Sequence, residues 1–320
     1  MKIQRRTLLL TAVAGAASTL LAACGGGDDD LGDIVAVAQA TPDFSILVEA
    51  VAAAGLVDTL KGNGPFTVFA PTNAAFAALL VELGVTKDAL LADKALLTAV
   101  LTYHVLPGKV ESTAVAGLLG KPITTVQGDI FKVESVGSAL KITDGRNRQA
   151  TITATDIQAS NGVIHVIDKV ILPANKTIVE TAIASAPEFS ILVEAVVAAG
   201  LVGTLSGAGP FTVFAPTNAA FAAALTELSL TKDQLLASPL LGDILKYHVV
   251  SGRVLKADVP VGVGIATVLG TTETFQVSSA LAITDEVGRV ANIAATDVLA
   301  SNGVIHVIDK VILPSAFLPP

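Results

Sequence analysis

The sequence has a single cysteine, no tryptophan, one methionine and two tyrosines among 320 residues. One cysteine cannot form a disulfide within the chain, so the fold must be held together by packing. A cysteine-rich zinc site is excluded as well, and four histidines offer few other ligands. The phosphate-binding and nucleophile motifs GxxxxGK, GxGxxG after a strand and GxSxG are also absent. The sequence therefore excludes a disulfide scaffold and contains no motif of an enzyme.

Positive charge is scarce, because 20 Lys and Arg stand against 28 Asp and Glu, a formal net charge of −8. Removal of Lys2, Arg5 and Arg6 with an N-terminal signal would lower the basic count from 20 to 17 and the net charge to −11. Such a protein is a poor partner for nucleic acid. The 52% of hydrophobic residues is rich in alanine and valine, and beyond residue 24 no uninterrupted apolar run has the length of a membrane span.

The N-terminus has the pattern of an export signal. Basic residues precede an apolar run over Leu8–Leu21, which leads into Leu-Ala-Ala-Cys ending at Cys24. The small residues before Cys24 resemble the lipobox of bacterial lipoproteins, in which the cysteine is acylated and becomes the new N-terminus. We expect a signal peptide over residues 1–23, lipid attachment at Cys24 and a flexible acidic Gly/Asp tether over residues 24–32. The arginine pair leaves open whether export uses the Sec or the twin-arginine route.

A string of fourteen residues, SNGVIHVIDKVILP, occurs unchanged at Ser160–Pro173 and at Ser301–Pro314. A longer block at Thr41–Phe76 matches Ala186–Phe221 at 30 of 36 positions, and the tripeptide YHV recurs between the blocks. The repeated order predicts two tandem domains, each long enough to bury a core of its own. Identity alone does not separate structural constraint from recent duplication. The expected divisions are a first domain at 33–173, a linker at 174–177, a second domain at 178–314 and a tail at 315–320.

Each copy changes along its length from helical to extended patterning. Apolar residues over Phe44–Val51 follow helical spacing after a Thr-Pro pair, so we expect a helix with Thr41 as its N-cap and Pro42 in its first turn. The segment GPFTVFAPTN predicts a buried strand, with a helix over 74–83 after it and another over 87–103. Beyond residue 107, segments rich in Val, Ile and Thr predict several strands. The last two form a hairpin whose Asn-Gly turn favours positive φ angles.

The four histidines lie at matching places in the two copies, at His104, His165, His248 and His306. Duplicated histidines invite a catalytic or metal-binding interpretation. The strand around His165 is apolar on both faces, however, which predicts a buried histidine that is hydrogen-bonded rather than reactive. Each copy also has too few ligands at short spacing for a metal site. We therefore expect core roles for the histidines, with no bound metal, no cofactor and no enzymatic activity.

Taken together, GPFTVFAPTNAAF, the YHV after a helix and NGVIHVIDKVILP resemble the signature blocks of fasciclin-like domains. The resemblance spans nearly all of residues 33–314, with three separated blocks in the right order twice. It implies an α+β fold of two tandem fasciclin-like domains, each a β-wedge of about seven strands packed with several α-helices. It also implies a secreted or membrane-anchored, non-enzymatic module for cell adhesion or for interaction with proteins or matrix.

The resemblance also implies candidate interaction residues, because an Asp-Ile pair and the Tyr-His motif of animal members have been connected to integrin binding. These positions either contact a host receptor or are architectural, and buried aliphatic neighbours favour architecture. Surface turns that differ between the copies are further candidates, since loops on a shared scaffold usually carry specificity. The matching residues are Tyr103, His104, Asp156 and Ile157 in the first copy and Tyr247, His248, Asp297 and Val298 in the second, and the turn candidates are Arg146 and Arg148 in DGRNRQ and Arg289 in DEVGRV.

The expected protein is thus a bacterial lipoprotein, anchored in the cell envelope at the outer membrane or cell surface because Gly25, rather than aspartate, follows Cys24. Its expected partners are the membrane, through the lipid, and an unidentified surface, matrix or host macromolecule. The alternative is a carrier of an apolar small molecule such as a carotenoid or lipid, since some fasciclin-like proteins bind carotenoids and apolar helices would line a groove.

Overall fold

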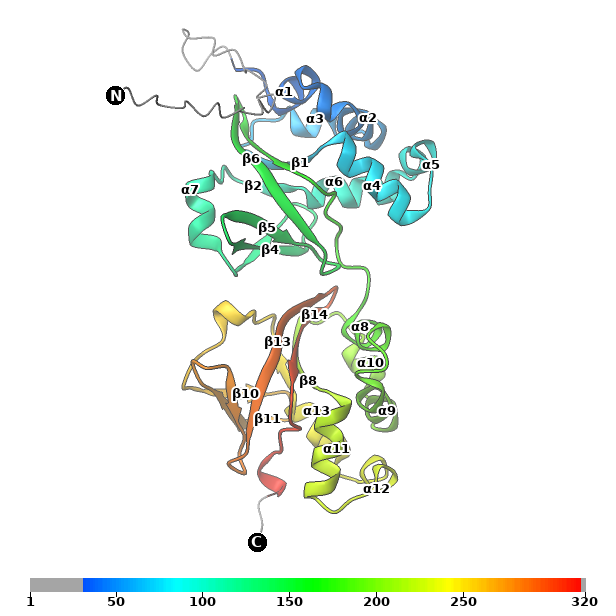
Figure 1. The fold of residues 1–320 in the computed structure, drawn as a ribbon, viewed down its shortest axis with the longest axis vertical. Helices are drawn as coiled ribbons and strands as arrows, with labels where there is room; N and C mark the ends of the chain where they lie inside the picture. Colours follow the sequence, from blue (N-terminus) through cyan, green and yellow to red (C-terminus); the bar gives the residue numbers. More distant parts are fainter. Residues whose placement is uncertain (1–30, 318–320) are drawn as a thin grey trace, which may run out of the picture.

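The computed structural model describes residues 31–317, which form two α+β domains stacked end to end (Figure 1). The expected signal peptide, Cys24 and most of the expected tether lie outside the described residues, as do the last three residues. Each domain combines a seven-stranded sheet with a set of helices. The two domains repeat the same order of elements, with small differences that prove informative.

The two sheets share one topology. The strands are β1 (Phe66–Pro71), β2 (Val105–Pro107), β3 (Pro122–Thr124), β4 (Ile130–Val136), β5 (Ala139–Thr143), β6 (Gln149–Ala159) and β7 (Gly162–Ile167), then β8 (Phe211–Pro216), β9 (Val249–Ser251), β10 (Gly264–Thr267), β11 (Gly270–Val277), β12 (Ala282–Thr284), β13 (Val290–Ala300) and β14 (Gly303–Ile308). The first sheet has the order β2-β1-β7-β6-β5-β4-β3, and the second has the equivalent order β9-β8-β14-β13-β12-β11-β10. Among the paired strands of residues 31–317, β1–β7 and β8–β14 are parallel and the others are antiparallel. Strands β3 to β7 and β10 to β14 pair in chain order, whereas helices separate β1 from β2 and β8 from β9 along the chain.

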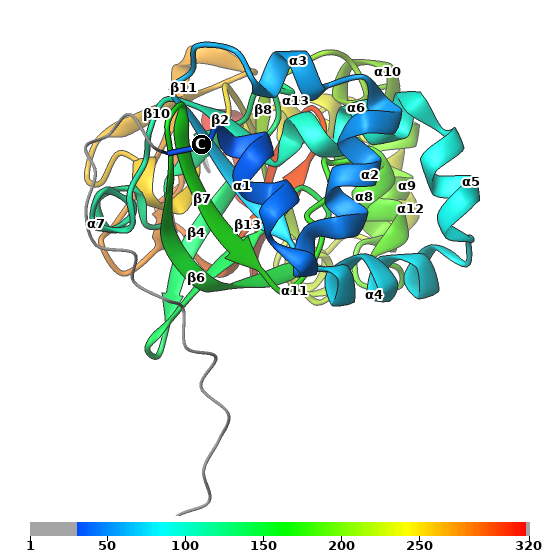
Figure 2. The ribbon, with the colours of Figure 1, turned by 90° about the horizontal axis from the view of Figure 1, so that it is seen from above.

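The helices of the two domains lie mostly on one side of their sheets, as the view along the long axis shows, whereas α7 (Ser112–Val115) lies on the opposite side (Figure 2). They are α1 (Ile34–Ala40), η2 (Pro42–Phe44), α2 (Ser45–Ala54), α3 (Val57–Leu60), α4 (Asn73–Leu83), α5 (Lys87–Ala92), α6 (Lys94–Tyr103), α7 (Ser112–Val115) and η3 (Ala116–Leu118) in the first domain, and α8 (Ile178–Ala184), α9 (Ser190–Ala198), α10 (Val202–Leu205), α11 (Asn218–Glu227), α12 (Lys232–Leu236), α13 (Leu241–Tyr247), η4 (Lys256–Asp258) and η5 (Ser315–Phe317) in the second. No single helix within residues 31–317 is long and apolar enough to cross a membrane, and only α1 together with Pro42–Ala54, bent by 110°, meets those criteria as a pair.

One of the expected helix boundaries is confirmed and another was wrong. Thr41 is the N-cap position and Pro42 lies in the first turn, because the 3-10 turn η2 leads directly into α2. The apolar spacing did not reveal the preceding helix, α1, which ends at Ala40. The helix expected over 87–103 is two helices, because the Asp93 carboxylate accepts the N–H of Leu96 and starts α6 there. The strand in GPFTVFAPTN is confirmed as β1, and Thr72 caps α4 as its position after the strand suggests.

Each domain has two hydrophobic cores, one on either face of its central strands. Helices α1, α2, α4 and α6 pack against one face of β1 and β7, whereas the other face encloses the interior of the curved sheet. Phe69 of β1 lies in this interior, edge-on to Phe131 of β4 with ring centroids 5.2 Å apart. Phe214 and Phe275 repeat the contact at 4.9 Å in the second domain. The expectation that the VIHVID strand is buried on both faces is therefore confirmed.

The repeated Ser-Asn-Gly turn connects the sheet to the start of each domain. The Asn161 side chain accepts the N–H of Ile34 at 2.9 Å and donates to the carbonyls of Leu60 and Gly62. A Cβ atom on Gly162 would lie 2.1 Å from the carbonyl oxygen of Phe66. The expected reason for the Asn-Gly pair was wrong, since neither residue has a positive φ. The pair is explained by the amide contacts and by the close approach of β1.

Asn302 and Gly303 repeat this arrangement in the second domain. The Asn302 side chain accepts the N–H of Ile178 and donates to the carbonyls of Leu205 and Gly207. A Cβ atom on Gly303 would lie 2.0 Å from the carbonyl oxygen of Phe211. The unchanged string thus includes a connection between sheet, first helix and loop that both copies need.

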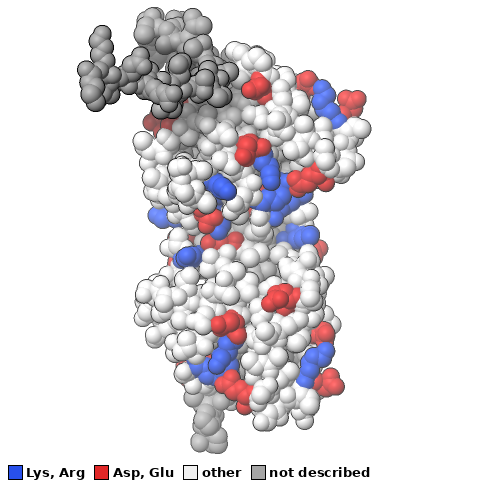
Figure 3. All heavy atoms as spheres, viewed as in Figure 1, with Lys and Arg blue, Asp and Glu red and all other residues white. Residues whose placement is uncertain are grey.

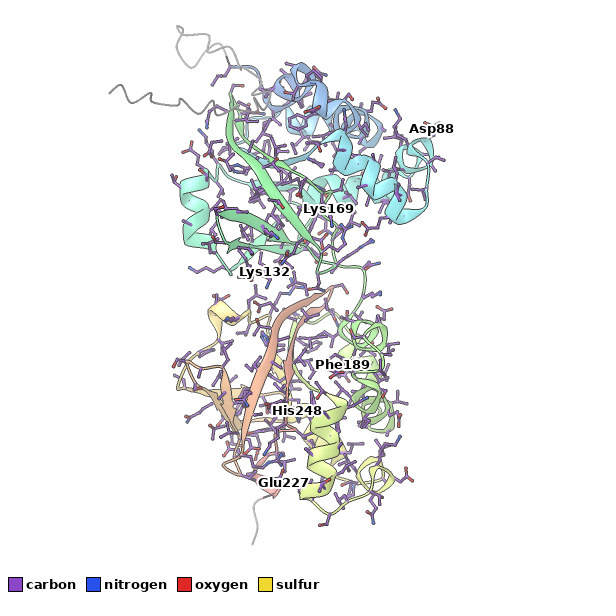
Figure 4. The ribbon with its side chains drawn as sticks, viewed as in Figure 1. Asp88, Lys132, Lys169, Phe189, Glu227 and His248 are labelled. Atoms are coloured by element: carbon purple, nitrogen blue, oxygen red, sulfur yellow. The ribbon has the colours of Figure 1, made fainter. Side chains whose placement is uncertain are left out.

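The two domains contact each other through a small mixed interface. Lys132, at the domain boundary in Figure 4, reaches from β4 to the carboxylate of Asp297 in β13 at 3.3 Å, and both side chains are buried. The Asn147 side chain donates a hydrogen bond to the carbonyl of Leu299 and accepts one from its N–H. Ile130 of the first domain packs with Leu255 and Leu299 of the second. The contact joins one end of the first sheet to the hairpin end of the second.

Candidate functional site

The two Tyr-His motifs lie at the ends of equivalent helices, at the junction with the sheet interior. The hydroxyl of Tyr103 donates to the carbonyl of Ile130 at 2.7 Å and accepts the N–H of Gly145 at 2.8 Å. Tyr247 makes the same pair of contacts with Thr274 and Glu286. Neither tyrosine is exposed, and burial is the main cause that raises the pKa of both phenols. The tyrosines therefore connect the last helical turn to the strands and turns of the sheet.

His104 and His248 are held in one neutral form by the backbone. Nδ1 of His104 donates to the carbonyl of Val100 at 2.7 Å, and Nε2 accepts the N–H of Ile171 at 3.1 Å. His248 makes the equivalent contacts with Ile244 and Ile312. Since a carbonyl can only accept and an amide can only donate, the proton must reside on Nδ1. Burial is the main cause that lowers the pKa of both imidazoles to about 4.

Acidification should destabilise both domains through these two histidines. In the unfolded chain each imidazole titrates near pH 6.5, whereas in the folded domain its pKa is about 4. Between these values the unfolded state binds more protons, so the free energy of unfolding decreases as the pH falls from 6.5 to 4. A pKa difference of one unit corresponds to about 1.4 kcal/mol, so the difference between 6.5 and about 4 predicts a loss of about 3 kcal/mol per domain. Urea unfolding at neutral and acidic pH, followed by circular dichroism, measures it.

The substitution His104→Gln provides the control for this prediction, because it removes the titrating group from the first domain only. The unfolding transition of the first domain should then depend less on pH between 6.5 and 4. The second domain keeps His248 and should retain its full pH dependence. If both transitions of the variant remain equally pH-dependent, the histidine is not the source of the acid sensitivity.

His165 and His306 lie in the central strands β7 and β14 and are also saturated by backbone contacts. Nδ1 of His165 accepts the N–H of Asp156 at 3.2 Å, and Nε2 lies 2.8 Å from the carbonyl of Val110, to which it donates. His306 has the equivalent partners, the N–H of Asp297 and the carbonyl of Val254. Burial is the main cause that lowers the pKa of His306. Within residues 31–317, no three His, Cys, Asp or Glu residues are grouped as a metal site requires.

The acidic residues of the Asp-Ile and Asp-Val pairs lie at matching bulges in β6 and β13. Asp156 and Asp297 have φ angles of 62° and 61°, where the register of the hairpin shifts. The Asp156 carboxylate accepts the N–H of Ser112 at 2.8 Å and its hydroxyl. Burial opposes ionisation of Asp156, but the hydrogen bonds from Ser112 prevail and lower its pKa. Asp297 instead accepts the N–H of Lys256 at 2.7 Å and pairs with Lys132 across the domain boundary.

The aliphatic partners of these acids take part in packing. Ile157 is half-buried against the helix-side core of the first domain, and Val298 has the same position in the second. The structure thus brings each Asp close to the histidine of the neighbouring strand through the backbone. It does not bring the Tyr-His pair and the Asp-Ile pair together into one constellation, since no hydrogen bond between these pairs is among the contacts of the described residues.

Two of the three candidate arginines are committed to intramolecular contacts. Arg148 pairs with the buried Asp144 at 2.8 Å and with Glu82 of α4 at 2.7 Å. Arg289 donates to the carbonyl of Val311 at 2.7 Å and lies 3.4 Å from Glu227, which Figure 4 marks near the lower end of the second domain. These side chains fasten the hairpin turns to the helices.

Arg146 is half-exposed and lies in a different setting, a polar groove between the domains. The groove has a volume of about 390 Å³ and is lined by Arg146, Asn147, Lys176 and Val298, among others. Arg146 itself donates to the carbonyl of Pro173 at 3.4 Å, and burial together with Arg148 lowers its pKa. Elsewhere the face seen in Figure 3 is mostly uncharged, with acids and bases in small mixed groups. The groove therefore combines two candidate residues with a further basic side chain.

An apolar groove also lies beneath α1 and α2, where the carrier interpretation expected one. Its lining includes Ile34, Leu47, Val51, Val68 and His104. The volume is only about 60 Å³, and the corresponding groove of the second domain has about 30 Å³. Pockets for drug-sized ligands have several hundred Å³. In this conformation neither groove accommodates a carotenoid or an intact lipid.

Several residues that organise these positions were not predicted from the sequence. Asp144 accepts the N–H groups of Arg148 and Leu172, and Asp285 repeats this with Arg289 and Leu313. The spacing of Asp and Arg by four residues in both copies is a signal that could have revealed the turn. Lys132 gave no such signal, because its partner Asp297 lies 165 residues away.

Comparison with known proteins shows several relatives. The chain is similar to Protein sll1483 of Synechocystis sp., with 46% identity over 143 residues that cover 44% of this chain and 73% of the relative. It is similar to the transforming growth factor-beta-induced protein ig-h3 of Sus scrofa, with 30% identity over 260 residues that cover 80% of this chain and 36% of the relative. The immunogenic protein MPB70 of Mycobacterium bovis is 35% identical over 147 residues, which cover 44% of this chain and 69% of the relative.

A solved structure of a FAS1 domain pair from the insect cell adhesion molecule Fasciclin I aligns over 83% of this chain and 95% of that chain, at 20% identity and a TM-score of 0.41. The Fasciclin domain model matches the sequence twice, at residues 42–173 and at residues 187–314. The two matches cover most of the chain, and each lies within one of the two α+β units and begins after its first helix, α1 or α8. The chain therefore belongs to the fasciclin domain family, with two copies of the domain in tandem.

Proposed function

We propose that this protein is a non-enzymatic, surface-anchored module for cell adhesion or for interaction with proteins or matrix. Membership of the fasciclin domain family supports the proposal. The observation that carries it is the use of the four histidines, each of which donates to a backbone carbonyl and accepts a backbone N–H. A histidine with both nitrogens engaged is not available as a base or a metal ligand. The proposed interaction with a partner must then be made by residues on the protein surface.

We propose that a lipid on Cys24 holds this module at the bacterial envelope, at the outer membrane or cell surface. The apolar segment before Cys24 and the small residues beside it support this anchor. The glycines and aspartates that follow are suited to a flexible spacer between membrane and domain. The partner is an unidentified surface, matrix or host macromolecule.

The groove between the domains is the contact region that we propose for this partner. Arg146 and Lys176 give it two basic side chains, and Val298 adds an apolar contact. Tyr103, His104, Tyr247 and His248 are buried, so a direct contact would require the domain to open. Asp156, Ile157, Asp297, Arg148 and Arg289 would act by shaping the surface rather than by touching the partner.

Attachment of native host cells to one another, or to a matrix-coated surface, tests the proposal. Wild-type cells should attach more than a deletion strain, and the Cys24→Ala variant should fall to the deletion level because the protein is no longer retained. The double variant Arg146→Glu/Lys176→Glu should lose attachment while its surface amount is unchanged. The control Lys61→Glu/Lys94→Glu makes the same change of charge at two exposed lysines away from the groove. Equal attachment of wild-type and deletion strains would refute the proposed function.

The alternative function, carriage of a carotenoid or lipid, has weaker support from the geometry. The apolar grooves under the helices are too small for either molecule in this conformation. Native mass spectrometry with an absorption spectrum on protein from its own host separates the two functions. A bound apolar molecule of constant mass would favour the carrier, whereas a bare polypeptide favours the adhesion module.

A further inference from the structure

The second domain has an apolar pocket where the first domain has a helical plug. The pocket has a volume of about 280 Å³ and lies between β8, β9 and the segment that leads into β10. Its wall is formed by Phe214, Val250, Val254, Val259, Pro260 and Ile265. The exposed residues Val263 and Ala266 line it as well, so the pocket opens to the surface.

A comparison of the two copies explains why the space exists. Sixteen residues run from Gly108 to Ile123 in the first domain, whereas fourteen run from Gly252 to Ile265 in the second. The longer segment forms α7 and η3, and Leu118 of η3 and the following Leu119 are partly buried against the sheet interior.

In the second domain the two leucines are replaced. Leu119 bridges to Val133, and at the equivalent bridge to Val277 the second domain has Val261, which is 54% exposed. The residue before it is Pro260 instead of leucine. In place of α7 and η3, the second domain has only the short 3-10 helix η4 in this segment. Proline is smaller than leucine and Val261 is largely exposed, so neither fills the volume of the leucine that it replaces, and a space of this kind remains.

The chemistry of the lining selects the ligand. The only hydroxyl in the wall belongs to Thr212, which donates to the carbonyl of Gly252 and accepts the N–H of Val254. Of the described residues, none with a charged side chain lines the pocket. An enclosed apolar space of about 150 Å³ is enough to bind benzene, so a space of this size suits a compact molecule of one or two rings.

We propose that this pocket is a binding site for a compact, neutral, apolar small molecule, and that it is particular to the second domain. The site goes beyond the proposed adhesive function and does not depend on it. It differs from the grooves under the helices in its position, at the opposite face of the sheet. Val263, which lines the pocket and is 59% exposed, would extend the apolar contact of the bound molecule.

The neutral fluorescent probe N-phenyl-1-naphthylamine, titrated into the full chain, tests the proposal. We expect saturable binding of one probe molecule per chain, with nuclear Overhauser contacts between the probe and the methyl groups of Val259 and Ile265. The variant Ala266→Phe adds a large side chain at the exposed mouth of the pocket and should raise the Kd by about tenfold or more. Thr124→Phe is the matched control, since Thr124 is the exposed equivalent position of β3, and it should leave the Kd unchanged.

A graft provides a second variant that does not depend on the tolerance of β10 for a phenylalanine. Replacement of residues 256–262 by residues 112–120 of the first copy restores the plug and should abolish binding. The proposal is overturned if the probe does not bind saturably, if neither variant weakens binding, or if Thr124→Phe weakens it as much as Ala266→Phe. Binding that survives both pocket variants would identify the helical grooves as the site instead.

Discussion

Replacement of Gly162 by alanine should unfold the first domain and leave the second folded. The added Cβ atom would lie 2.1 Å from the carbonyl oxygen of Phe66 and 2.8 Å from the Cδ1 atom of Ile34. The carbonyl belongs to the paired strand β1, whose register with β7 begins at Phe66 and Gly162, so it cannot move aside cheaply. We expect a loss of more than about 4 kcal/mol, which is a large fraction of the stability of such a domain.

Urea unfolding followed by tyrosine fluorescence measures this loss domain by domain, because Tyr103 and Tyr247 are the only two tyrosines and each domain has one. The reciprocal variant Gly303→Ala should unfold the second domain instead. Gly117→Ala is the control, since nothing lies within 4 Å of the position of its Cβ and its φ is not positive. A Gly162→Ala protein with two wild-type transitions would contradict the assignment of Gly162 to a close backbone contact.

The variant Lys132→Met should uncouple the two domains. Lys132 and Asp297 have side chains that are 7% and 3% exposed, and removal of the ammonium leaves the buried carboxylate with only the N–H of Lys256. Loss of one partner from a buried ion pair typically costs about 3–5 kcal/mol. We expect this cost to appear as a lower unfolding midpoint for the second domain. The maximum dimension measured by small-angle X-ray scattering should also increase.

Two further variants make the prediction specific. Lys132→Met/Asp297→Asn removes both charges and should recover part of the lost stability, because no unpaired charge remains. Gln276→Met changes the equivalent exposed position of β11, which faces no partner domain, and should have little effect. If Lys132→Met and Gln276→Met behave alike, the ion pair does not hold the domains together.

Much of the architecture was predictable because the signals are local. The helical spacing before β1, the strand in GPFTVFAPTN and the two-sided burial of VIHVID depend on neighbouring residues, and the structure confirms each. The helix α1 and the break at Asp93 were not predicted. At Asp93 a capping side chain starts a new helix within a continuous apolar pattern. The histidines were expected in the core, and the structure shows the hydrogen bonds that hold them.

The interface was beyond reach of the sequence because its partners are distant along the chain. Differences between the copies were interpreted as surface variation that carries specificity. Several of these differences instead arise because one copy of the position is buried between the domains, whereas the other copy lies at an end of the molecule that is exposed to solvent. Asn147 of the turn DGRNRQ bonds Leu299, whereas the equivalent Gly288 has no side chain. Leu255 and Leu299 are buried at the boundary, where the first copy has Glu111 and Gln158.

The asymmetry of this contact bears on self-assembly. The face on β4 of one domain meets the hairpin end of the next, a head-to-tail association that has no intrinsic limit and in other proteins generates filaments. Here the hairpin end of the first domain presents Glu111 and Gln158 instead of two leucines. The far end of the second presents Thr274 and Gln276 instead of Ile130 and Lys132. A second molecule therefore finds no matching surface at either end, and growth by this contact stops at the pair.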